Sequence, residues 1–201
     1  MFSIERTDNL RAFLTDLKPY IVISTIVFTL SIAVGYIAYG IYPEYAMQSV
    51  SGLEELVQML EGLSPLEIML LIFINNTIAM FISVLFGIVL GIVPLLVLVL
   101  NGFIIGTIVR LLLVDNGLPF IIAGLIPHGI IEIPLLLLSA SIGMRIGHEV
   151  LRALAGKPSD IKNVFINGMK FFFYWMIPLI FVAALIETFI TPVIMYLVAG
   201  A

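Results

Sequence analysis

Two ionisable side chains, His128 and Glu132, stand four residues apart in the otherwise apolar segment "LIPHGIIEIP", residues 125–134. Residues at this spacing lie one turn apart on the same face of an α-helix. A charged group deep in a bilayer costs at least ~2.5–3.5 kcal/mol on insertion scales, so such a group persists when it is paired or functional. The pair therefore marks a candidate site.

Three interpretations of this pair remain open. In the first, Glu132 is structural and is stabilised by the helix N-terminus after Pro127, by His128, or by a donor such as Arg110 or Asn101. In the second, His128 and Glu132 bind a metal ion, because imidazole and carboxylate are common ligands. A third ligand would then come from the residues Glu187, Asn75, Asn76 or Asn101. In the third, the pair belongs to a proton or ion relay lining a cavity.

Glu187 is the other carboxylate well inside an apolar run, and Thr188, Thr191 and Pro192 follow it. It is either a buried acid bonded to a neighbouring helix or, with Glu132, part of one polar cluster. Asparagines inside membrane helices usually form hydrogen bonds between helices. The candidate polar or ion site consists of His128, Glu132, Glu187, Asn75, Asn76 and Asn101, with no organic cofactor and a bound metal ion as the alternative.

The composition identifies an integral membrane protein. Of 201 residues, 62% are hydrophobic and 11% are charged, against roughly 45–50% apolar residues in soluble domains. The absence of cysteine excludes thiolate chemistry, and the nine Lys and Arg residues are too scattered for a nucleic-acid surface. Neither H-E-x-x-H nor G-x-S-x-G occurs, so we do not predict an enzyme.

Hydropathy predicts an all-α bundle of about five spans, forming a single transmembrane domain over residues 1–201. The spans are expected at 20–41, 66–90, 92–114, 119–147 and 171–198. Pro127, His128 and Gly129 divide the fourth and predict a broken or re-entrant helix near 119–129. Outside the spans, residues 1–18 form the N-terminal segment, 51–62 a short amphipathic helix with a capping box at Ser51, and 148–168 an amphipathic basic segment.

The distribution of basic residues predicts the orientation of the chain. Eight of the nine fall on one side of a five-span arrangement, whereas residues 43–65 on the other side carry only acids. Because basic loops stay in the cytoplasm, we expect a cytoplasmic N-terminus and an external C-terminus in the cell membrane. The eight are Arg6, Arg11, Lys18, Arg145, Arg152, Lys157, Lys162 and Lys170.

Glycine pairs at four-residue spacing predict close helix packing. Small residues at this spacing let two helix backbones approach each other in lipid. Such faces serve either packing within one chain or the interface of a homodimer. The pairs are Gly87 with Gly91, Gly102 with Gly106, and Gly143 with Gly147.

The segments "NG" and "FIIG" at 101–106 and "PHGIIEIPLLLLSASIGMRIG" at 127–147 resemble the stage II sporulation protein M family. The resemblance is clearest over residues 70–150. It implies a membrane anchor that recruits cell-wall-degrading partners while a forespore is engulfed, although the family also occurs in organisms that form no spores. It assigns no catalytic role to His128 or Glu132.

The sequence therefore predicts a non-enzymatic membrane scaffold that organises partner proteins, in contact with lipid and forming a homodimer. The alternative is a channel or secondary transporter for an ion or small solute. In that case His128, Glu132, Glu187 and the asparagines line the path.

Overall fold

The computed structural model describes residues 7–48 and 62–199 of the chain, and the regular elements in these ranges are all helical. Most of the predicted helix at 51–62 falls in 49–61, outside the described residues. The elements are α1 (Thr7–Ile41), α2 (Pro43–Gln48), α4 (Pro65–Leu85), η1 (Phe86–Ile88), α5 (Ile92–Asp115), α6 (Leu118–Leu154), α7 (Ile161–Phe171), η2 (Phe172–Met176), α8 (Ile177–Leu185), η3 (Ile186–Ile190) and α9 (Thr191–Ala199).

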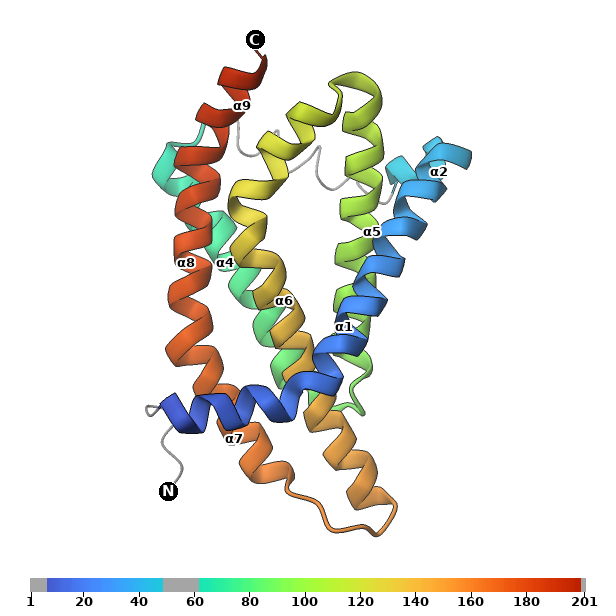
Figure 1. Ribbon diagram of the computed structural model, residues 1–201, viewed down its shortest axis with the longest axis vertical. Helices are drawn as coiled ribbons and strands as arrows, with labels where there is room; N and C mark the ends of the chain where they lie inside the picture. Colours follow the sequence, from blue (N-terminus) through green and yellow to red (C-terminus); the bar gives the residue numbers. More distant parts are fainter. Residues whose placement is uncertain (1–6, 49–61, 200–201) are drawn as a thin grey trace.

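Among the described residues, five helical segments are long and apolar enough to cross a bilayer, which confirms the prediction of an all-α polytopic bundle. They are Leu10–Ile41, Pro65–Ile88, Ile92–Val114, Gly129–Leu154 and Ile161–Val198. The start of α1 and the loop between α6 and α7 lie at one end of the bundle, and the C-terminus lies at the other (Figure 1). We call these the N-terminal end and the C-terminal end.

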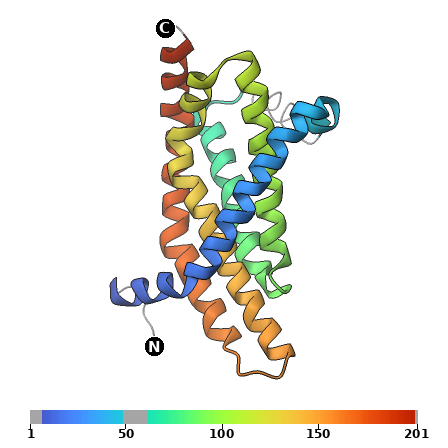
Figure 2. The same cartoon turned by 45° about the vertical axis from the view of Figure 1, so that its right-hand side comes forward.

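Helix α1 changes direction near Pro19, which lies inside it. Its first turns run across the N-terminal end of the bundle, and the remainder rises along α5 (Figures 1 and 2). A proline inside a helix removes one backbone hydrogen bond and clashes with the preceding turn, which accounts for the bend. One helix thus supplies both a surface segment and a membrane span.

Helix α6 is the central element of the bundle and packs against each of the other spans. In its most apolar stretch 56% of the residues are buried, against 22–28% in the other spans. The predicted break near 119–129 does not occur, because α6 remains helical from Leu118 to Leu154 with Pro127 and Pro134 inside it. Its first turns lean toward the top of α5 (Figure 1), so the helix bends where we expected it to end.

The predicted glycine pairs all lie at contacts between helices of the same chain. A methyl group added at Gly102 or Gly106 would overlap α1, and one at Gly35 would overlap the backbone of α5. Gly87 lies against Gly143, and Gly91 lies against Gly147. The connection between α4 and α5 therefore sits directly on α6, and backbone contact fixes the positions of α1, α4, α5 and α6.

The last span is one helical column from α7 to α9 with two wider turns in it. These π-helical turns, η2 and η3, end shortly before Pro178 and Pro192, respectively. A π turn shifts the hydrogen-bond register by one residue, so it relieves the clash that a following proline makes with the preceding turn. Glu187 lies within the second π turn.

Candidate functional site

Three polar side chains from three different spans meet in the interior of the bundle. Asn76 of α4 is within hydrogen-bonding reach of the Glu132 carboxyl on α6, and Glu187 of η3 is close enough to interact with that carboxyl electrostatically. All three residues are half-buried. We call Asn76, Glu132 and Glu187 the polar cluster.

The polar cluster lies near mid-depth of the bundle. Asn76 is about halfway along the span Pro65–Ile88, and its neighbours in the cluster must lie at a similar level. Few water molecules reach this depth, so hydrogen-bonding groups must find partners within the protein. The Asn76 amide serves this purpose for Glu132, since an amide N–H₂ group can donate to a carboxyl oxygen.

The π turn η3 gives Glu187 an unusual backbone setting. Thr191 at its end donates a hydrogen bond from Oγ1 to the carbonyl oxygen of Ile186 at 3.3 Å. The threonine hydroxyl therefore satisfies a carbonyl that the irregular turn exposes. Because π turns widen the helix locally and recur at functional sites, this turn is a plausible place for a functional carboxylate.

A cavity of about 540 Å³ extends from Glu187 toward the C-terminal end of the bundle. Its walls come from the start of α4, the second half of α5, the first turns of α6, and from η3 with α9. Isoleucine, leucine and proline side chains form most of the lining, and the polar lining residues are Glu187, Thr188 and Thr191. The cavity is thus apolar, with a carboxylate near its inner end.

The structure separates two of the predicted asparagines from the polar cluster. Asn101 donates to the carbonyl oxygen of Val97 in its own helix at 2.8 Å. Asn75 is exposed on the outer face of α4. Asn75 thus faces away from the interior, and the Asn101 amide is engaged within its own helix.

Arg110, considered above as a donor to Glu132, instead contacts α1. It donates to the Tyr36 hydroxyl at 2.7 Å, and its guanidinium carbon lies 4.9 Å from the centre of the Tyr36 ring. The tyrosine offers both a hydrogen-bond acceptor and an aromatic face to the cation. Arg110 is therefore engaged by α1, and the polar neighbour that the structure gives Glu132 on α4 is Asn76.

The metal site proposed at His128 and Glu132 remains a prediction. The two residues lie one turn apart on the continuous helix α6, and the structure describes the backbone of His128 but not its side chain. Among the side chains that are described, no three His, Asp or Glu residues converge on a common point.

Thr188, noted above as the residue after Glu187, was not included in the predicted site. Its hydroxyl oxygen is buried and lacks a hydrogen-bond partner among the described residues, and the side chain lines the cavity beside Glu187. Its position directly after Glu187 in a long apolar run is a signal that could have found it.

These features define a multi-pass α-helical membrane protein with a polar cluster at mid-depth. The family model for SpoIIM, stage II sporulation protein M, matches residues 24–192, so the chain belongs to this family. The match includes all three residues of the polar cluster. No curated protein and no solved structure matches the chain.

Proposed function

We propose that this chain is a non-enzymatic scaffold in the cell membrane that organises partner proteins at its N-terminal end. The observation that supports this role most directly is the first segment of α1, residues 7–18, which projects sideways from the bundle near that end (Figure 2). We call this segment the platform. A segment held outside the bundle offers a surface that partners can reach without entering the membrane.

Contacts from two other helices, α6 and α7, hold the platform and Tyr20, which follows its bend. The Phe13 ring packs on Phe171 with 5.3 Å between ring centres, and Arg145 forms a 3.0 Å salt bridge with Asp16. Tyr20, just beyond the bend, is hydrogen bonded to Nδ1 of His148. Burial of Phe13 and Leu17 against the bundle adds to these contacts. The platform is therefore fixed relative to the spans.

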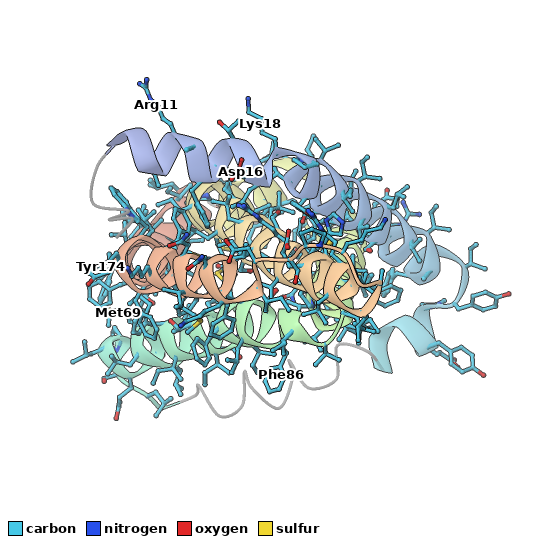
Figure 3. All side chains as sticks on the ribbon, turned by 90° about the horizontal axis from the view of Figure 1, so that it is seen from below. Arg11, Asp16, Lys18, Met69, Phe86 and Tyr174 are labelled. Carbon is cyan, nitrogen blue, oxygen red and sulfur yellow. The ribbon has the colours of Figure 1, made fainter. Side chains whose placement is uncertain are left out.

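The opposite face of the platform carries positive charge into solvent. Arg11 and Lys18 are exposed and project away from the bundle (Figure 3). The excess of basic residues at this end favours the cytoplasm, which would place the C-terminus outside. An acidic surface on a partner protein would complement the platform.

Reversing the charge of the platform tests the scaffold proposal. We expect the double variant Arg11→Glu/Lys18→Glu to lose a larger complex that wild-type protein forms when it is extracted from its native membrane. Lys157→Glu/Lys162→Glu, an equal charge change at exposed positions at the same end, should retain the complex. A wild-type chain that migrates alone, or equal loss in both variants, would contradict the proposal.

A channel or secondary transporter is the second candidate, favoured by the polar cluster at the inner end of a cavity. Two carboxylates and an amide at mid-depth are the kind of polar groups that mark ion and substrate pathways in membranes. A transporter predicts proton or cation flux into liposomes that disappears in Glu132→Gln and Glu187→Gln while both variants stay folded. A scaffold predicts no such flux.

A further inference from the structure

The cavity above the polar cluster has the mixed lining that is usual in small-molecule sites. Its walls are almost entirely apolar, and a carboxylate, Glu187, contributes to its lining. Its volume of about 540 Å³ lies within the roughly 300–1,000 Å³ range of small-molecule sites. A space of this size and lining can hold a small molecule, and its lining indicates which kind.

The carboxylate lies at the deep end of the cavity. Lining residues on the last column run from Met195 inward to Glu187, a separation of roughly 12 Å at 1.5 Å per residue. The lining residues on α4 cover the same range of depth, from Pro65 at the outer end to Ile72 at the inner end. A molecule that enters from the C-terminal end would therefore contact apolar side chains first and the Glu187 carboxylate last.

Two further observations indicate the charge of the occupant. Glu187 interacts with a second carboxyl group, Glu132, so the two groups together attract a cation. The buried hydroxyl of Thr188 lines the same cavity and lacks a partner among the described residues. A hydroxyl oxygen can accept a hydrogen bond from an ammonium group that a carboxylate also binds.

We propose that this cavity binds a hydrophobic amine, with the protonated amino group bonded to Glu187 and Thr188 and the apolar body packed against α4, α5, α6 and α9. The proposal rests on neither the scaffold nor the transport role. A lipid chain would match the walls of the cavity but not its acidic end.

The test compares an amine with a neutral molecule of the same shape. Tritiated 1-adamantylamine is bound to the full chain in lipid nanodiscs at neutral pH and displaced by unlabelled amine or by 1-adamantanol. We expect saturable binding of one amine per chain, displaced at least about tenfold better by the amine than by the alcohol, since a charge-assisted hydrogen bond distinguishes them.

Variants locate the binding. Glu187→Gln should weaken amine binding about tenfold or more and remove the preference for the amine, and Thr188→Val should weaken it severalfold. Gly124→Leu should abolish binding, because an added side chain there meets only the flexible end of Met195 and then fills the cavity. Ile126→Phe adds volume to the exposed face of the same helix and should bind normally.

The proposal is overturned if wild-type protein shows no saturable binding or if amine and alcohol compete equally, which would identify a lipid-filled space. It is also overturned if Glu187→Gln or a folded Gly124→Leu binds the amine as wild type does. Should Gly124→Leu fail to fold, the comparison of Glu187→Gln with Thr188→Val still decides. Failure here leaves both proposed functions as they stand.

Discussion

Adjacent residues of the same type can have different roles in this protein, as Asn75 and Asn76 show. Asn76 faces the interior and reaches Glu132, whereas Asn75 is exposed on the outer face of α4. The sequence alone treats the two amides alike, because hydropathy does not specify which face of a helix meets its neighbours. Their environments differ because of the packing of α4 against α6.

This difference predicts unequal effects on stability. Asn76→Leu removes the donor to a buried carboxyl group and should lower the free energy of unfolding by about 1–3 kcal/mol. Asn75→Leu replaces an exposed amide with an apolar side chain and should leave the stability of the single chain within about 0.5 kcal/mol of wild type. Unfolding of dilute protein in detergent measures both, and equal losses would contradict the pairing of Asn76 with Glu132.

At the scale of elements, close backbone contact explains why α1 and α5 run together. Gly106 lies against the backbone of Ile32, with no room for a methyl group, whereas a methyl group at Gly40 would meet only the Arg110 side chain at 3.7 Å. The same substitution should therefore have opposite consequences at these two glycines.

Gly106→Ala should destabilise the bundle by about 2 kcal/mol or more, because the two helices must separate to admit the methyl group. Gly40→Ala should be neutral or slightly stabilising, since alanine favours the helix. Thermal unfolding of the purified variants checks this. Similar melting temperatures would indicate that α1 and α5 are not in backbone contact at Gly106.

The packing of α1 on α6 can be tested separately by cross-linking. Ser24 and Ser141 lie on facing sides of these helices, with their hydroxyl oxygens 3.0 Å apart in the interior. The chain has no cysteine, so the two thiols of the double variant Ser24→Cys/Ser141→Cys are the only thiols in the protein.

Mild oxidation of this double variant should form a disulfide and remove both thiols from reaction with a maleimide–polyethylene glycol reagent after denaturation. Ser24→Cys/Ser139→Cys is the matched control, because Ser139 is also buried but stands two residues, roughly 200°, around α6 from Ser141. Equal protection in the two variants, or none in either, would show that α6 is rotated relative to this arrangement.

Much of the element layout could be predicted because hydropathy and proline positions are local. The five spans follow from hydropathy, but the continuity of α6 through Pro127 does not. Pro127, His128 and Gly129 predict a break, but the neighbouring helices hold α6 together and Pro127 only bends it. The capping box that the structure shows, Ser64 with Glu67, starts α4 and was also missed, although its spacing is legible in the sequence.

The candidate site was only partly accessible to such reasoning. Glu132 and Glu187 could be predicted as site residues because a carboxylate inside a membrane span is energetically costly. Their proximity could not be predicted, because it depends on the order in which the helices pack. The cavity beside Glu187 has no local signal, because its walls are ordinary apolar residues from four elements. Glu132, Glu187 and the cavity form a candidate site only through the way the helices pack in the folded chain.

At the scale of the whole molecule, the glycine faces are occupied within the chain, so a homodimer must use another surface. The exposed face of α4 carries Asn75 among apolar side chains such as Leu71, Ile74 and Ile78. An amide facing hydrocarbon gains hydrogen bonds when it meets the same amide of a second copy. We therefore predict that the chain dimerises through α4.

Energy transfer between differently labelled chains in lipid vesicles measures this association. Asn75→Leu should weaken dimerisation by roughly three- to tenfold, in line with the ~0.6–1.7 kcal/mol measured for such bonds in membranes. Leu100→Ala, a change on the exposed face of α5, should leave it unchanged. Undiminished transfer in Asn75→Leu would place the interface elsewhere.

The scaffold proposal rests on whether the platform touches other proteins in the living cell. Incorporating a photo-crosslinking amino acid at Arg11, with the lipid-facing position Val34 on the same helix as control, measures this directly. The account predicts a discrete protein adduct on irradiation from position 11 and none from position 34. A folded, membrane-inserted chain that yields no protein adduct from position 11 would contradict it.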